Sequence, residues 1–225
     1  EFWLFCLAAA GHGLYNAFAL YYRFAAADSA PAAYRPRAVS YVMAGGVVAA
    51  VAGPQIAIWT REALPAAFAG TYAALAVLPV AAMLVLAFLN VAPAHADDAE
   101  DPAPPRPLSA IAAQPVFVVA VLCGMIGYGG MTLLMTATPL AMAACDHSFD
   151  SAAFVIQWHV LGMFLPSFFT GRLINRFGVL TVMGTGGVLY LLTIAIALSG
   201  QSVPAFWVAL VLLGVGWNFL FVGAT

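Results

Sequence analysis

The stretch GRLINRFG, residues 171–178, separates two long apolar segments and decides how they are connected. Glycine at each end lets the chain bend where a side chain would be strained. The two arginines between them carry charge that stays at a membrane surface, because a charge inside hydrocarbon is costly. We therefore predict a tight loop between two antiparallel membrane helices, with a helix ending at its first glycine. Its candidate functional residues are Gly171, Arg172, Asn175, Arg176 and Gly178.

The composition is that of a membrane protein. Hydrophobic residues make up 64% of the chain and charged residues only 7%, whereas soluble domains carry about a quarter charged residues. The net charge of −2 and the lack of a long basic run argue against a nucleic-acid partner. Cys6, Cys123 and Cys145 show no metal-binding spacing, so we expect free thiols, no metal and no cofactor. The chain opens on Glu1 without a basic signal segment, and we expect a fragment.

Seven windows are long and apolar enough to cross a bilayer, which takes roughly 20 residues each. The sequence therefore predicts an all-α fold, a polytopic membrane helix bundle. Charged residues are expected only in the connections, apart from Glu1. The expected spans are residues 2–22, 38–59, 64–89, 116–143, 152–174, 179–198 and 203–222.

The arginines predict the orientation. Six of the seven follow the first, third or fifth span, and only Arg61 lies in an alternate connection. Cytoplasmic loops carry the excess of basic residues, so the first, third and fifth connections should face the cytoplasm of a plasma (inner) membrane. The third is residues 92–115, rich in Pro, Ala and acid, and we expect a solvated cytoplasmic linker there. It divides the chain into residues 1–91, with three helices, and residues 116–225, with four.

The loop at 171–178 resembles a signature of the major facilitator superfamily, usually written Gly-x-Leu-x-Asp-Arg-x-Gly-Arg-Arg/Lys. It matches at Gly171, Leu173, Arg176 and Gly178. It departs at Asn175, where the family has aspartate, and after Gly178, where basic residues are missing. The resemblance implies a twelve-helix transporter built of two bundles, of which seven helices are visible here, and it implies that residues 171–178 form a gating loop.

Two further motifs fit this resemblance. Gly-x-Gly, an aromatic residue and Asn occur at residues 11–16 in the first span and at residues 214–218 in the last, as expected of two repeated halves. Gly53-Pro54 resembles part of a motif that antiporters carry on helix five. Together with the linker, these positions imply that the chain runs from helix four to helix ten.

Small residues recur every fourth position on the second span, at Gly45, Ala49, Gly53 and Ala57. Such a face lets another helix approach closely, either as ordinary packing or as a surface that slides against helix eight. Pro54 removes one backbone hydrogen bond and should bend this helix.

Polar and aromatic residues inside the spans are the candidate substrate contacts. A buried imidazole or amide must be hydrogen-bonded or wetted. These side chains therefore either line a substrate cavity or make hydrogen bonds between helices. The set is His12, Asn16, Tyr128, Thr132, Thr136, Gln157, His159, Trp217 and Asn218.

The resemblance implies a secondary active transporter, not an enzyme, in which two bundles alternate around a site near the bilayer midplane. The visible spans lack charged residues, which favours a small neutral or amphipathic organic substrate. Proton-coupled export is the expected mode, with a carboxylate on helices one to three as the carrier and His12 as its partner. Two other classes stay open: a non-transporting receptor or scaffold, and a membrane redox protein that uses His12 and His159 as ligands.

Overall fold

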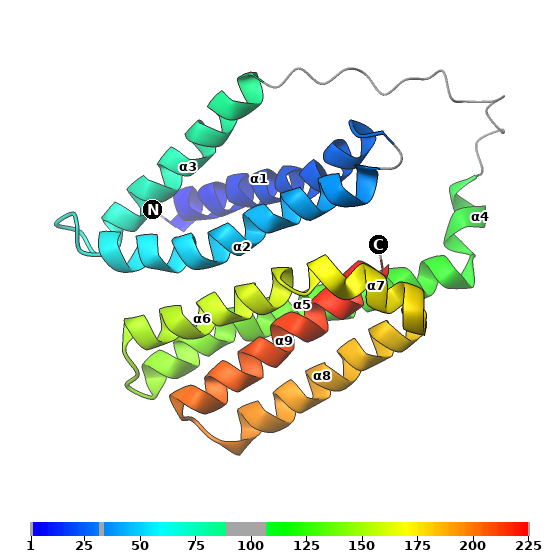
Figure 1. Cartoon of the computed structure of the whole chain (residues 1–225). Coiled ribbons are helices and arrows are strands. Elements are labelled where there is room, and N and C mark those ends of the chain that lie inside the picture. The colour runs from blue at the N-terminus through cyan, green and yellow to red at the C-terminus, as the bar shows by residue number, and fades with distance from the viewer. Residues whose placement is uncertain (1, 32–33, 89–106, 225) are drawn as a thin grey trace. The chain divides into compact units, whose positions relative to one another are not determined.

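The computed structural model describes residues 2–31, 34–88 and 107–224, and all regular structure in these ranges is helical. The all-α prediction is confirmed (Figure 1). The helices are α1 (Phe2–Asp28), α2 (Arg35–Thr60), α3 (Ala69–Ala87), α4 (Leu108–Ala112), α5 (Pro115–Ala144), α6 (Phe149–Phe164), α7 (Ser167–Phe177), α8 (Val179–Ser199) and α9 (Val203–Ala224).

The described helices supply six or seven candidate membrane spans. Six are long and apolar enough alone, and α6 with α7 make a seventh if the bent pair counts as one. The expected number of spans is confirmed. Some of the expected connections are helical: Arg23 and Asp28 lie in α1, and Asp150 lies in the first turn of α6. These helices continue past the apolar window, and the charges sit near their ends.

The third predicted span and the predicted linker differ from the structure. The third begins at Ala69 and not near residue 64, because the chain turns tightly between Arg61 and Phe68. The backbone N–H of Phe68 donates to the carbonyl of Arg61 over 3.0 Å, and Phe68 has a φ of 61°. The linker also differs where it is described: residues 107–114 include the short helix α4. Most of the expected linker, residues 92–106, lies outside the described residues.

The contacts divide the chain into two compact units, which are described separately. The first contains α1 and the start of α2 as far as Gly45. The helix α1 has no buried residue. The second unit begins at Gly46 and contains the rest of α2 and the helices α3 to α9. This boundary falls inside α2, and the sequence-based division at residues 92–115 stays a prediction.

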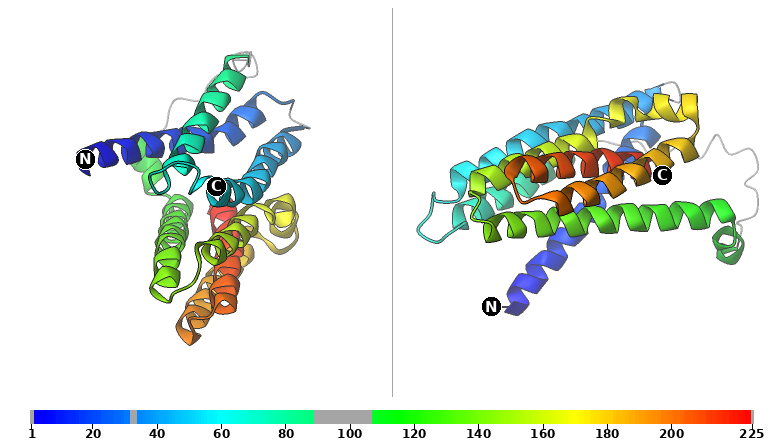
Figure 2. Two further views of the ribbon diagram at one scale, coloured as in Figure 1. Left: turned by 90° about the vertical axis from the view of Figure 1, so that its left-hand side faces the viewer. Right: turned by 90° about the horizontal axis from the view of Figure 1, so that it is seen from below.

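In the second unit α9 is the central helix. It packs against α8, α6 and α5, and lies between α6 and α8 in both Figure 1 and Figure 2. Glycines allow the close approach: a Cβ added to Gly214 would come within 2.4 Å of the carbonyl oxygen of His159 on α6. One added to Gly216 would come within 3.0 Å of the carbonyl of Gly186 on α8. In a membrane the hydrophobic effect does not drive helices together. Small residues at the helix contacts instead let the backbones approach closely and pack by van der Waals contact.

The predicted fifth span is broken into α6 and α7, which meet at an angle of 44°. Pro166 follows α6 and lacks the N–H that would continue the helical hydrogen bonds. Asn218 of α9 compensates: its amide nitrogen donates to the carbonyl of Met163 over 2.7 Å and to the hydroxyl of Ser167 over 2.6 Å. The hydroxyl of Thr170 lies 2.6 Å from the Oδ1 of Asn218. The side chain of Asn218 thus bridges both sides of the break.

Candidate functional site

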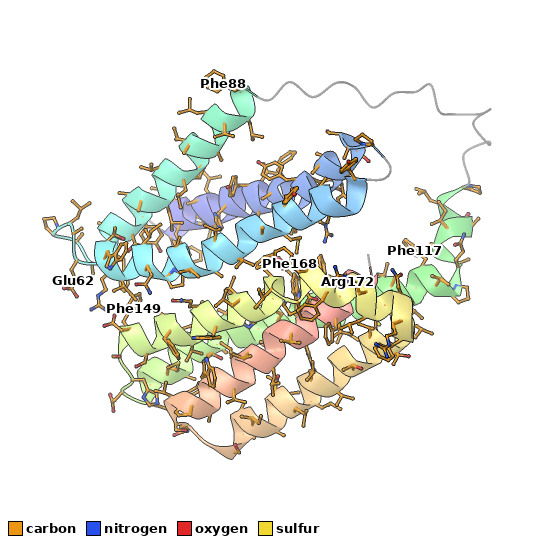
Figure 3. The ribbon with its side chains drawn as sticks, viewed as in Figure 1. Glu62, Phe88, Phe117, Phe149, Phe168 and Arg172 are labelled. Atoms are coloured by element: carbon orange, nitrogen blue, oxygen red, sulfur yellow. The ribbon has the colours of Figure 1, made fainter. Side chains whose placement is uncertain are left out.

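The loop predicted at residues 171–178 is mostly helical. Residues 171–177 belong to α7, which ends at Phe177, so the prediction that a helix ends at Gly171 is wrong. The turn into α8 is made by Gly178 alone, with φ 83° and ψ 150°. Arg172, Asn175 and Arg176 are exposed on α7, and Figure 3 shows where Arg172 lies on this helix. The helix can continue past Gly171 because Gly178 alone, in a conformation that other residues rarely adopt, is enough to reverse the chain.

The small-residue face of α2 is shifted by one position from the prediction. A Cβ added to Gly45 or Gly53 would meet no atom within 4 Å, so neither glycine is a close-packing position. Gly46 is the close contact: a Cβ there would lie 2.6 Å from the ring of Phe164 on α6. Ala50, one turn further, is buried. The helix therefore turns a neighbouring face toward α6.

Two further contacts join α2 and α6 within the second unit. The amide of Gln55 donates to the Oε1 of Gln157 over 3.3 Å. A guanidinium nitrogen of Arg61 lies 3.3 Å from the carboxylate of Asp150 and the same group covers the ring of Phe149. Gly46 contacts Phe164, so the partners on α6 come earlier in the sequence as the contacts move along α2. The two helices are therefore antiparallel. The predicted site residue Gln157 is therefore a helix contact in the structure. Figure 3 shows Phe149 at the beginning of α6.

A cavity of about 690 Å³ opens inside the second unit between α2, α3, α5 and α6. Its wall is almost entirely apolar, and Gly53 and Pro54 take part in it, together with Met135 and Val160. None of the nine predicted substrate contacts lines this cavity. Polar groups border it only through Thr71, His147 and Ser148.

His159 and Asn218 are fully buried at helix contacts. The Nδ1 of His159 lies 2.8 Å from the carbonyl oxygen of Leu210 on α9. A carbonyl can only accept, so Nδ1 carries the proton and ties α6 to α9. Asn218 bridges the break between α6 and α7, as described above. Both side chains match the alternative that polar groups in the spans serve interhelical hydrogen bonds.

The structure brings two predicted residues, Tyr128 and Trp217, into one aromatic cluster. The cluster comprises Tyr128 of α5, Phe164 of α6, and Trp217 and Phe221 of α9. The rings of Trp217 and Phe221 are stacked, with centroids 4.7 Å apart and planes inclined by 12°. Tyr128 is 6.4 Å from Trp217 and 6.1 Å from Phe221, and Phe164 is 6.3 Å from Trp217. These separations suit attractive aromatic pairs.

Phe164 and Phe221 were missed by sequence reasoning. Phe221 follows Trp217 by four residues, so their stacking on one helix face could have been inferred from periodicity. Phe164 could not, because its contact depends on how α6 packs on α9. The remaining predicted contacts do not join the cluster in the described structure: Thr132 and Thr136 are exposed on α5, and His12 and Asn16 are exposed on α1 in the first unit.

The described residues contain no group of three or more His, Cys, Asp or Glu side chains that could hold a metal ion. His12 and His159 lie in different units, and Nδ1 of His159 is committed to the Leu210 carbonyl. The three cysteines are free thiols.

Comparison with known proteins gives a consistent result. The chain is 47% identical over its full length to the Riboflavin transporter RfnT of Brucella anthropi, and it spans 57% of that protein. It is 40% identical over 45% of its length to the Uncharacterized MFS-type transporter YddS of Bacillus subtilis, covering 23% of it. It is 37% identical over 42% of its length to YdeG of the same organism, again covering 23%. No solved structure matches the chain.

The family model of the Major Facilitator Superfamily matches residues 1–225, and the loop signature, the helical fold and the candidate spans agree with it. All three relatives carry the name of a transporter, which supports the expectation that the chain is not an enzyme. The chain belongs to the major facilitator superfamily.

Proposed function

We propose that the protein is a secondary active transporter that moves a small neutral or amphipathic organic molecule by alternating access, with riboflavin as the first candidate substrate. The observation that carries this proposal is the 47% identity to a riboflavin transporter over the full length of this chain. Because the chain spans 57% of that relative, the substrate is assigned by similarity and tested on the full-length protein.

The chemistry of the described helices supports an uncharged substrate. The sequences of α5, α8 and α9 contain no Asp, Glu, Lys or Arg. A strongly charged solute would find no counter-ion on them and would lose its hydration. Riboflavin joins a flat, uncharged ring system to a polyhydroxylated chain, and both parts can be held by aromatic rings and hydroxyl groups.

Uptake measurements test the proposal directly. Proteoliposomes that contain the full-length protein should accumulate labelled riboflavin. Unlabelled riboflavin should compete, whereas glucose and a quaternary amine should not. If proteoliposomes carry the amine but not riboflavin, the neutral-substrate proposal is wrong.

Energy coupling is a second part of the proposal. We propose that protons drive the transport and that the protein resides in the plasma (inner) membrane. An imposed pH gradient should then drive riboflavin against its concentration gradient, and a protonophore should abolish that accumulation. The sign of the effective gradient will distinguish export from import. Accumulation that persists with the protonophore would contradict proton coupling.

A further inference from the structure

In the aromatic cluster of Tyr128, Phe164, Trp217 and Phe221, the residues Tyr128 and Trp217 lie far from the ends at which their helices begin, whereas Phe164 is the last residue of α6 and Phe221 lies three residues before the end of α9. Trp217 follows the start of α9 by 14 residues, which is about 21 Å along a helix. Tyr128 follows the start of α5 by 13 residues, or about 20 Å. Tryptophan and tyrosine usually anchor helices at the membrane surface. That role does not account for rings at this depth.

A second group of aromatic residues on the same helices serves as the comparison. Phe154 and Trp158 of α6 pack on Trp207 of α9, with centroids 6.5 and 5.7 Å from it. Trp207 follows the start of α9 by only four residues, or about 6 Å. Its position suits an interfacial belt. The deeper cluster therefore needs a different explanation, although both clusters have similar composition.

The deep cluster retains unused hydrogen-bonding capacity. The indole Nε1 of Trp217 is buried and has no acceptor among the described residues. The hydroxyl of Tyr128 likewise has no partner in the described part of the chain, and its side chain is 39% exposed. The Nε1 of Trp207 in the outer group is buried without an acceptor as well, so depth, and not the unpaired N–H alone, distinguishes Trp217. Two donors thus lie beside a stack of aromatic rings.

Space for a ligand lies next to this cluster. Gly124 precedes Tyr128 by one helical turn, and a Cβ added there would meet no atom within 4 Å. Met135 packs against the cluster and also lines the cavity of about 690 Å³, so the cluster and the cavity adjoin. None of the four rings lines the cavity itself, so a flat molecule would meet the cluster at the exposed side of Tyr128.

We propose that Tyr128, Phe164, Trp217 and Phe221 form the subsite that receives the flat ring system of the substrate, selecting uncharged fused heteroaromatic rings that carry carbonyl or ring-nitrogen acceptors. The rings of Tyr128 and Phe221 stack on the ligand, Trp217 and Phe164 support them, and the donors of Trp217 and Tyr128 pair with its acceptors. This inference rests on the proposed function, and it assigns the part of the substrate that the described helices recognise.

Flavin fluorescence tests the subsite on the purified full-length protein. Stacking on tryptophan or tyrosine quenches flavin emission, so riboflavin should lose fluorescence on binding. Lumiflavin, which keeps the ring system but lacks the ribityl chain, should give the same quenching and compete with riboflavin. Ribitol should do neither. These probes separate recognition of the ring from recognition of the chain.

Three variants with a matched control locate the effect. Phe221→Ala should weaken riboflavin binding by about tenfold, because it removes an aromatic stacking partner. Trp217→Phe keeps a ring in the core and removes only the N–H, so binding should weaken about threefold or more. Tyr128→Leu should reduce both affinity and quenching. Trp207→Phe removes the corresponding N–H from the outer aromatic group, and should leave binding unchanged.

The outcomes distinguish failure of the subsite from failure of the proposed substrate. If the protein carries riboflavin but Phe221→Ala, Trp217→Phe and Tyr128→Leu all bind it like the parent, with unchanged thermal unfolding, the subsite is wrong and the transport function stands. If the protein binds lumiflavin but carries no riboflavin, the substrate assignment is wrong and the subsite stands. If neither flavin binds the parent protein, the subsite is overturned as well.

Discussion

Polar residues in the spans either contact substrate or hold helices together, and the contacts of His159 place it in the second group. Its side chain is fully buried, and Nδ1 donates to the Leu210 carbonyl. Replacing it by alanine leaves a cavity and removes the hydrogen bond that ties α6 to α9. His159→Ala should therefore lower the free energy of unfolding by about 2–4 kcal/mol. Thermal unfolding in detergent measures this, with the exposed Thr132→Ala as control. A variant of normal stability that no longer binds substrate would instead place His159 in the site.

Gly214 is the residue on which the packing of α6 against α9 depends. A Cβ at this position would lie 2.4 Å from the backbone oxygen of His159 and 3.0 Å from the backbone of Gly162. Backbone atoms cannot rotate away, so the two helices must separate. Gly214→Ala should destabilise the protein by about 1–3 kcal/mol. Gly184→Ala, on the open side of α8, meets no atom within 4 Å and provides the control. Equal thermal midpoints for both variants would contradict the close approach.

At the scale of elements, hydropathy was sufficient to place the spans. Seven apolar windows were predicted and six or seven candidate spans are found, because length and apolarity alone decide which segments can cross a bilayer. Three features could not be predicted in this way. The break at Pro166 depends on Asn218 of another helix, the choice of Gly46 over Gly45 depends on the rotation of α2, and Phe164 enters the aromatic cluster only through packing. Each depends on a contact between helices, and the hydrophobic pattern of a single segment carries no information about such contacts.

The structure gives the two glycines at the ends of residues 171–178 different roles, since only Gly178 makes the turn between α7 and α8. Gly178 has φ 83° and ψ 150°, a conformation reserved almost entirely for glycine and costing other residues about 1–3 kcal/mol. Gly171 lies within α7, where a Cβ meets nothing within 4 Å. Gly178→Val should therefore slow transport in proteoliposomes several-fold, with substrate binding little changed. Gly171→Val should have the smaller effect. The opposite order would show that helix contacts around Gly171, rather than the turn, govern the rate.

At the scale of the whole molecule, the arginine count predicts the topology. Cys145, in the turn between α5 and α6, is partly exposed and should react with a membrane-impermeant thiol reagent in intact cells. A cysteine introduced at Ala99, which lies outside the described residues, should not react until the cells are opened. The variant Cys145→Ser gives the background from the remaining thiols. Labelling of Ala99→Cys in intact cells would reverse the orientation and the helix-four-to-ten register with it.

Proton coupling requires a group that changes its charge within the membrane, and the structure separates the three described histidines in this respect. His159 is held between α6 and α9, and His147 lies in a turn, 2.7 Å from the carbonyl of Gln201. His12 lies in the middle of α1, where its exposed ring is near Tyr15 and has no hydrogen bond among the described residues. It is therefore the histidine best placed to pair with a carboxylate from another helix.

Two transport assays on the full-length protein distinguish a coupling role for His12 from a substrate role. Uptake driven by a pH gradient needs net proton movement, whereas counterflow exchange of labelled for unlabelled substrate does not. We expect His12→Ala to reduce the driven uptake by about a hundredfold, as the loss of a positioned proton-transfer group does, and to leave counterflow within about twofold. Leu14→Ala, two residues away on the same helix and exposed, controls for general damage to α1. Equal loss in both assays would make His12 a substrate or packing residue, because counterflow fails only when binding or the conformational change itself is impaired.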